Sequence, residues 1–317
     1  RSTLFPYTTL FRSERLAEHQ TGNPRDLVLH HVTQTPNPFR VERFLHQQFG
    51  PKRVRSEWFR LDDVELGEAV AVSERLAKEA FENLPVIEKA KKLGSVLSKE
   101  GKIAATPEAT DWHRRLMVAK HALKVCKHLN TEYLSVASKL PTEVRKQVES
   151  EELVLTEHYL SRTFDQDGFA AKHPRIFQQF LVTSRSVSGR FTPSSLPVDL
   201  EEMDRDLASF SRDFEGACDR VRAGELIFSD LFFLHQDLEI FEGAYVWDEE
   251  IADAHLRVLC GKAAGIEGLC TWNRTEKTTT DLDRDGLESA HGSKVEAFTK
   301  TEIKTRTKTK KRSRRQG

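Results

Sequence analysis

Apolar residues recur every three or four positions over much of this chain, which predicts that most of it is α-helical. One such run covers residues 62–97, and Pro85 inside it is expected to kink or split the helix. A second run covers residues 111–129 and is expected to continue towards residue 148. The polar segment between the two runs, residues 98–108, is predicted to be a linker.

The most regular spacing lies further along the chain. Two runs of apolar residues have the alternating three- and four-residue spacing of a heptad seam. The first run is Leu200, Met203, Leu207, Phe210, Phe214, Ala217 and Val221, and the second is Leu231, Leu234, Leu238, Phe241 and Tyr245. Gly224 either caps the first helix of an antiparallel hairpin or lies within one long helix whose seam would need a partner chain. We favour the hairpin, and a homodimer through the heptad helices is the alternative.

The segment before residue 62 mixes helix and strand. Residues 14–20 are typical of the end of a helix, and the alternation in Leu27–Thr35 predicts a strand. The pair Asn37-Pro38 begins a helix with proline in its first turn, and Gly50-Pro51 ends it. Trp58-Phe59 is expected to pack back into the core of this unit.

An internal repeat is visible in the second half of the chain, where residues 164–180 align without gaps to residues 282–298. Asp165 and Asp283 occupy equivalent positions, and each is expected to cap the helix that follows it. A metal-binding role is the weaker interpretation, because the two aspartates of each copy would not share a helix face. Since each copy follows a helical run and a short strand-like stretch, the predicted unit is helix, hairpin, helix.

The composition fits a polar, helix-rich protein, with 38% hydrophobic and 31% charged residues. No stretch approaches eighteen apolar residues, so no membrane span is predicted. The four cysteines lack a CxxC spacing and are expected to be buried, reduced thiols, which suits a cytoplasmic protein.

The formal net charge of zero hides an uneven distribution. Residues 300–317 contain nine Lys or Arg and one Glu, so this tail carries +8 and the rest of the chain carries −8. A basic tail of this kind can neutralise the phosphates of a nucleic acid. A solvated tail, or one that folds onto the acidic body, is the alternative.

Residues 1–13 match the translation of a common sequencing adapter, and we expect them to lie outside the fold. A native extended segment is the alternative, because the apolar residues of this segment would suit a strand. On the first interpretation, the natural protein is cut off on its N-terminal side.

The most specific motifs lie between residues 14 and 61. In order, they are RLxxxQTGNP from Arg15, ExxLHxxF from Glu42 and RxxxEWF from Arg53. This arrangement resembles the GIY-YIG nuclease superfamily, and within it the phage DNA-binding and meiotically up-regulated branch. The resemblance implies a protein that acts on DNA with the help of a divalent metal ion.

The resemblance also implies roles for particular residues. Glu42 would be the carboxylate that binds Mg²⁺ or Mn²⁺, and Arg15 would contact the scissile phosphate or orient the nucleophile. His46 lies one helical turn after Glu42 and would touch the water shell of the metal or the DNA. The residues expected to contact DNA are Arg25, Lys52, Arg53 and Arg55. We expect Glu42 to lie on the solvent-facing side of its helix, opposite the apolar stripe.

The chain departs from the family pattern in one decisive respect. The strands that carry the two tyrosines of the family should precede Arg15, where this sequence has the adapter-like segment. Tyr7 is therefore not taken as the general base. We expect the chain to be catalytically inactive and locally unstable near Leu27–Thr35, because a sheet with one native strand buries little surface. Ser56 also stands where the family usually has glycine.

A looser resemblance relates residues 111–180 and 230–300 to the C-terminal part of YqaJ-type viral recombinases. It implies a phage origin and an accessory, DNA-handling role. The leading hypothesis is a DNA-binding protein of the GIY-YIG endonuclease superfamily whose intact parent hydrolyses phosphodiesters. The alternatives are a non-catalytic DNA-binding protein and a coiled-coil interaction protein.

The predicted fold is an α+β N-terminal fragment with an incomplete GIY-YIG sheet, followed by a mostly α region with two helix-hairpin-helix repeats and a coiled-coil-like helical pair. The expected units are the adapter segment 1–13, the partial domain 14–61, a helical arm and linker 62–110, a first module 111–185, the heptad helices and second module 198–299, and the basic tail 300–317.

Overall fold

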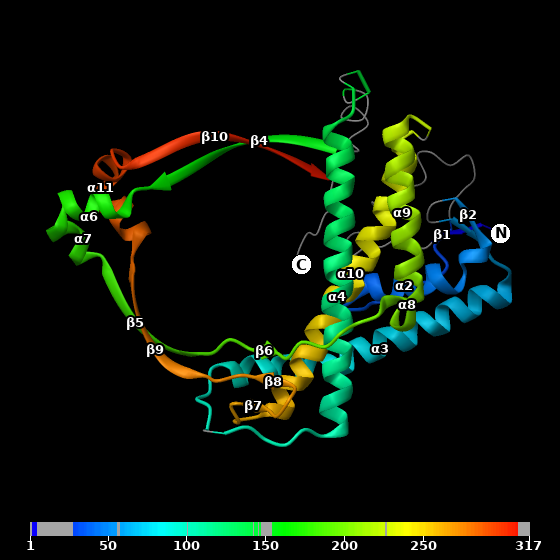
Figure 1. Ribbon diagram of the computed structural model, residues 1–317, viewed down its shortest axis with the longest axis horizontal. Coiled ribbons are helices and arrows are strands. Elements are labelled where there is room, and N and C mark those ends of the chain that lie inside the picture. The colour runs from blue at the N-terminus through cyan, green and yellow to red at the C-terminus, as the bar shows by residue number, and fades with distance from the viewer. Residues whose placement is uncertain are drawn as a thin grey trace.

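Four long helices form the body of the protein in the computed structural model (Figure 1). The structure describes residues 2–4, 28–55, 58–99, 101–141, 143–144, 146, 154–225 and 227–309. The four helices are α3 (Asp63–Gly94), α4 (Pro107–Ser138), α9 (Arg205–Ala223) and α10 (Phe228–Cys260). They confirm that this region is mostly helical.

The N-terminal ends of these helices follow from local sequence. The Asp62 side chain accepts a hydrogen bond from the backbone N–H of Glu65. The Glu65 side chain in turn accepts one from the backbone N–H of Asp62, so the two residues form a capping box. Thr106 caps α4, with Pro107 at its first position. Of the two outcomes expected at Pro85, a kink or a split, the split is wrong, since α3 runs unbroken through this residue.

The heptad seam lies inside the chain. Gly224 ends α9 in the left-handed conformation at φ 75°, so α9 and α10 are separate helices, as the hairpin interpretation predicted. The seam packs against α4, whose contribution to the shared core includes Leu129 and Tyr133. The buried seam residues are Leu207, Phe214, Ala217, Leu231, Leu238 and Tyr245. A third helix of the same chain therefore covers the surface for which a partner chain was considered.

The N-terminal unit combines a small antiparallel sheet with one helix. The sheet has the order β1 (Ser2–Leu4), β3 (Trp58–Arg60), β2 (Arg53–Arg55), and the helix is α2 (Pro38–Gln48), followed by the 3-10 turn η1 (Gly50–Lys52). Helix α2 begins after Asn37 as predicted, with the Asn37 side chain as its cap, and Phe59 is fully buried in the core. The predicted strand at Leu27–Thr35 is wrong: residues 28–35 have no regular secondary structure.

The N-terminal unit does not begin where the sequence predicted. The N-terminal residues 2–4, which we expected to lie outside the fold, form β1 and pair with β3. Residues 14–20, expected to end a helix, lie outside the described residues, as does Leu27.

Helix α2 crosses α10 at very short distance. A Cβ atom on Gly243 of α10 would lie 2.3 Å from the Cγ atom of Phe39 in α2, so only glycine leaves room for this ring. Across the same contact, the Arg43 guanidinium lies 4.4 Å from the centre of the Tyr245 ring. The N-terminal unit is therefore fitted against the helical body by specific side chains.

The two copies of the repeat form a small module at the far end of two long ribbons (Figure 1). The first copy runs β4 (Val154–Phe164), α6 (Gln166–Lys172), α7 (Pro174–Gln179) and β5 (Leu181–Ser188). The second runs β9 (Thr275–Leu282), α11 (Arg284–Glu296) and β10 (Thr299–Thr309). The prediction of helix-hairpin-helix units is not confirmed, because each copy places its helices between two strands.

Strands pair between the copies and not within them. β4 pairs with β10 and β5 pairs with β9, both antiparallel. The two ribbons have equivalent register: Phe164 lies opposite Thr299 in one, and the matching residues Leu282 and Leu181 lie opposite each other in the other. The repeat therefore builds a pseudo-twofold unit in which each copy completes the other.

The core of this module repeats the symmetry. The predicted caps are confirmed, since Asp165 accepts from the N–H of Gly168 and Asp283 from that of Gly286, each at 2.9 Å. His173 stacks edge-on against Phe298 and His291 against Phe180, both with ring centres 5.8 Å apart, so these histidines are packing residues. The apolar residues at the centre are Phe169, Leu287 and Val295.

A second core lies where α10 meets a three-stranded sheet of the order β6 (Thr192–Pro193), β8 (Cys270–Thr271), β7 (Gly265–Ile266). A short helix, α8 (Leu200–Met203), precedes α9. All four cysteines are buried free thiols, as predicted. In the described part of the chain, every helix is too short or too polar to cross a bilayer.

Candidate functional site

Glu42 and His46 lie one turn apart on α2, as the motif predicted, but the prediction that Glu42 faces solvent is wrong. Its side chain is 4% exposed and that of His46 is 10% exposed. The Nε2 atom of His46 lies 3.9 Å from Oε1 of Glu42, and its ring lies 5.1 Å from that of Phe59. Because β3 and α10 both cover this face of α2, the helical pattern of α2 alone did not indicate its burial.

The basic residues beside this pair are engaged by carboxylates. Both terminal nitrogens of Arg53 donate to Asp237 of α10 at 2.9 Å, and Nδ1 of His46 lies 3.9 Å from the same carboxylate. The exposed Lys52 pairs with Glu65 at 2.9 Å, and this hydrogen bond raises the pKa of Lys52. Asp237 therefore links the candidate site to the helical body.

The other predicted site residues are only partly visible. Arg15 and Arg25 lie outside the described residues, so their predicted approach to Glu42 stays a prediction. Arg55 lies in β2, two positions after Arg53. Of the predicted set, the structure brings together Glu42, His46 and Arg53.

The fit of a metal ion can be judged from the surroundings of Glu42. Mg²⁺ held by one carboxylate keeps several water ligands and needs room for them. The 4% exposure of Glu42 leaves little such room. No three His, Cys, Asp or Glu side chains in the described ranges are arranged to hold a metal ion. The described side chains around Glu42 therefore do not fit a magnesium ion in this arrangement.

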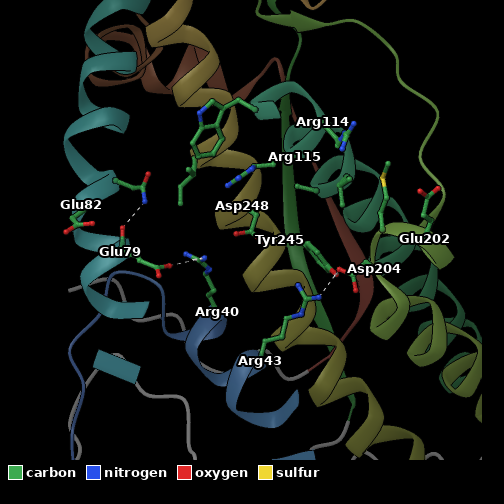
Figure 2. A pocket seen from close by; sticks show the side chains of 16 residues that line it. Arg40, Arg43, Glu79, Glu82, Arg114, Arg115, Glu202, Asp204, Tyr245 and Asp248 are labelled. Atoms are coloured by element: carbon green, nitrogen blue, oxygen red, sulfur yellow. Dashed lines mark hydrogen bonds and ion pairs between the residues drawn. The ribbon is translucent and has the colours of Figure 1, made fainter. Parts of the chain in front are cut away.

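A pocket of about 700 Å³ opens on another side of α2, between the N-terminal unit and the body (Figure 2). It is lined by Arg40, Arg43, Glu79, Glu82, Asn83, Trp112, Arg114, Arg115, Val118, Ala119, Glu202, Met203, Asp204, Tyr245, Asp248 and Ile251. Its volume lies within the range of small-molecule sites, but its lining is strongly charged, whereas most such sites are apolar.

The charges of the pocket are largely matched within the protein. Arg43 donates to Asp204 at 2.8 Å, and the Tyr245 hydroxyl donates to the same carboxylate. Burial would lower the pKa of Arg43, but Tyr245 and Asp204 together raise it. Burial raises the pKa of Asp248, an effect that Arg40 partly offsets. These contacts connect α2 to α10 and to the start of α9, and they engage the Arg43 side chain within the protein.

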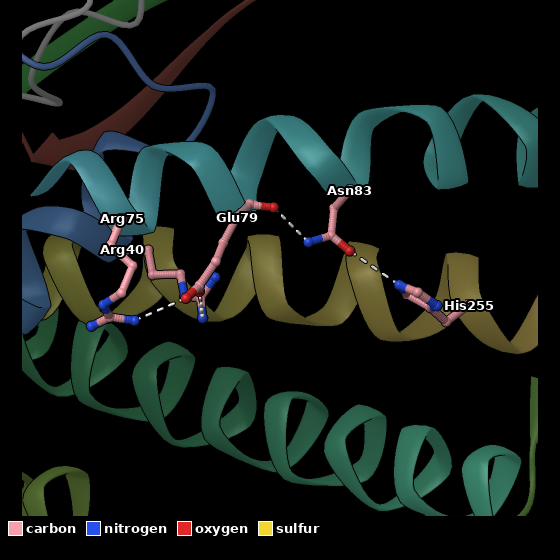
Figure 3. Close-up of polar contacts among 5 residues, drawn as sticks. All are labelled: Arg40, Arg75, Glu79, Asn83 and His255. Atoms are coloured by element: carbon pink, nitrogen blue, oxygen red, sulfur yellow. Dashed lines mark hydrogen bonds and ion pairs between the residues drawn. The ribbon is translucent and has the colours of Figure 1, made fainter. Parts of the chain in front are cut away.

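A polar network on α3 continues this connection (Figure 3). Glu79 accepts from Arg40 of α2 at 3.3 Å and from Arg75 at 2.8 Å. Asn83 donates to the backbone carbonyl of Glu79, and its side-chain oxygen lies 3.0 Å from Nε2 of His255 in α10. The network joins α2, α3 and α10 through side chains.

Three residues of these contacts were missed from the sequence. Asp204 and Tyr245 belong to the heptad region and Asp237 to the polar side of α10, where each was indistinguishable from an ordinary helix residue. Asp204 lies 161 residues after its partner Arg43, and Asp237 lies 184 residues after its partner Arg53. No local pattern could reveal contacts of that separation.

Comparison with known proteins identifies one region. Residues 7–83 match the model of the T5orf172 domain, which is associated with phage and GIY-YIG-like nucleases. This range contains Glu42, His46, Lys52 and Arg53, and it also includes Tyr7, within the segment that we expected to be foreign. No curated protein and no solved structure matches the chain. The N-terminal unit from residue 7 and the first part of α3 are thus similar to the T5orf172 domain, while the rest of the helical body and the repeat module lie beyond the match.

Proposed function

We propose that this chain is a DNA-binding protein whose N-terminal unit contacts the duplex without cleaving it. The observation that carries the proposal is the match of residues 7–83 to a phage nuclease-like domain. The sequence also supports it, because Lys52 and Arg55 follow α2 three positions apart and cationic side chains of this kind engage backbone phosphates, whereas Arg53 is held by Asp237.

Binding of a fluorescent duplex over a range of salt concentrations tests the proposal. Neutralising two phosphate contacts should weaken binding and reduce the slope of log Kd against log salt by about 2. We expect this for the double variant Lys52→Gln/Arg55→Gln. The matched control is Lys89→Gln/Lys92→Gln on the exposed side of α3, which should behave like the unmodified chain. An unmodified chain that does not bind duplex at low salt would contradict the proposal.

A second candidate, a metal-dependent endonuclease, rests on the match to a nuclease-like domain, whereas the burial of Glu42 argues against it. Incubation of supercoiled plasmid with Mg²⁺ or Mn²⁺ separates the two candidates. We expect no nicking. Nicking that Glu42→Gln abolishes, but that the exposed α3 variant Glu68→Gln retains, would establish the nuclease instead.

A further inference from the structure

Over residues 158–164 and 299–305, whose side chains the structure describes, the ribbon formed by β4 and β10 exposes side chains on both faces. Its strands have eleven residues each and pair from Phe164 and Thr299 to Val154 and Thr309. Successive side chains of a strand point to opposite faces. Tyr159 and Leu160 are 37% and 68% exposed, so neither face is covered over the described side chains of this ribbon. A two-stranded ribbon buries little surface of its own, and an uncovered one is available for a partner.

The charge of this ribbon differs from that of its counterpart. Its sequence contains Arg162, Lys300, Lys304, Arg306 and Lys308 against Glu157 and Glu302, a net charge of +3. The β5/β9 ribbon contains Arg185 and Lys277 against Glu276 and Asp281, a net charge of zero. Because the two ribbons have equivalent register, the fold itself does not require the positive excess.

The exposed groups of the ribbon suit a nucleic acid. Lys304 lies opposite Tyr159 in the register, so an ammonium group and an aromatic ring share one face, with Ser161 and Thr163 further along it. Hydroxyl and cationic side chains are the ordinary donors to phosphate oxygens. Lys300 is 77% exposed and is held by Glu302, which still leaves it at the surface.

The dimensions also match a double helix. Eleven residues of strand extend about 36 Å, close to one turn of B-DNA at about 34 Å. The major groove of B-DNA is wide enough to admit a two-stranded ribbon. We propose that the basic β4/β10 ribbon is a second contact surface for duplex DNA, which it engages along the phosphates that border the major groove.

This inference deepens the proposed function and relies on it for the nature of the partner. The test measures Kd for a duplex of about 20 base pairs and for a single strand of the same length, at salt concentrations around 100 mM, where phosphate contacts dominate affinity. The ribbon variant is Lys300→Gln/Lys304→Gln, and Arg185→Gln/Lys277→Gln on the other ribbon is its matched control. All four side chains are exposed, and thermal melting verifies that the variants stay folded.

We expect the ribbon variant to bind duplex about tenfold more weakly, with a salt slope smaller by about 2, and the control to change Kd less than twofold. The single variant Lys304→Gln should give about half of that change in slope. Equal affinity of the ribbon variant and the unmodified chain for duplex would overturn the inference. A loss confined to the single strand would also overturn it.

The outcome is separable from that of the proposed function. If only Lys52→Gln/Arg55→Gln weakens binding, the N-terminal contact stands and the ribbon is not a contact. If only the ribbon variant weakens binding, the ribbon contact stands and the N-terminal assignment falls.

Discussion

At the scale of single residues, burial decides chemistry more strongly than residue type. His235 of α10 is 4% exposed, and its Nε2 atom lies 2.9 Å from the side-chain oxygen of Asn130. Its ring packs 4.2 Å from that of Tyr133. Burial lowers the pKa of His235 to about 4. A neutral, hydrogen-bonded imidazole is therefore part of the central core.

This burial predicts a pH-dependent stability. Below pH 6.5 the unfolded chain protonates His235, whereas the folded chain does so only near pH 4. The folded state then binds fewer protons, so the free energy of unfolding should fall as the pH decreases from 6.5 to 4. The loss is at most about 3 kcal/mol.

Urea denaturation at several pH values measures this loss. The variant His235→Gln should flatten the dependence in that window, and the exposed His30→Gln should leave it unchanged. An equally steep dependence in His235→Gln would contradict the assignment.

At the scale of elements, a few contacts between helices position the candidate site. Gly243 lets α10 approach Phe39, while Asp204 and Asp237 hold Arg43 and Arg53. The position of Glu42 thus depends on α10, an element nearly two hundred residues away in sequence. The N-terminal unit and the body meet through matched shapes and charges.

The variant Gly243→Ala should loosen this contact. Its Cβ would lie 2.3 Å from the ring of Phe39, so α2 or the ring must move, at a cost of about 1–3 kcal/mol. The matched control is Gly216→Ala in α9, where nothing lies within 4 Å of the new Cβ. Because alanine is the better helix former, the control should be neutral or stabilising by up to about 1 kcal/mol.

Chemical denaturation gives both free energies, and limited proteolysis of the N-terminal unit reports its docking. Equal stability of the two variants would show that the close approach of α2 to α10 does not exist in solution.

At the scale of the whole molecule, two distant segments combine into one module. The β4/β10 ribbon reaches the helical body beside α4, and the β5/β9 ribbon reaches it at the small sheet of β6, β8 and β7 that packs on α10 (Figure 1). Each copy of the repeat supplies one strand to each ribbon. The internal repeat thus joins two segments of the second half of the chain through two antiparallel ribbons.

A designed disulfide tests this pairing between the copies. Thr183 and Thr280 are register partners with hydroxyl oxygens 3.1 Å apart, and cross-strand partners lie within the reach of a disulfide. We expect the pair Thr183→Cys and Thr280→Cys to cross-link under mild oxidation. The control pair Ser184→Cys and Thr280→Cys points to opposite faces and should not. Mass spectrometry of the linked peptides reads the result, and cross-linking of both pairs alike would contradict the register.

Much of the local structure could be predicted because it depends on neighbours in sequence. The caps Asn37, Asp165 and Asp283 bond to N–H groups three residues away. The hairpin break at Gly224 needs only a positive φ that glycine adopts readily. The wrong prediction of a strand at Leu27–Thr35 has a different cause. A strand needs a partner strand, and the alternation in residues 28–35 finds none among the described residues.

The sequence by itself determined the long helices, the helical hairpin, the repeat and the motif that places Glu42 one turn before His46. Each of these follows from side chains within about one turn of one another or from a periodic apolar stripe. The tertiary structure alone decided that Glu42 is buried, that Asp237 holds Arg53 and that the repeat copies exchange strands. Those outcomes depend on which distant surfaces meet, and many different pairings bury similar apolar area, so local pattern does not choose among them.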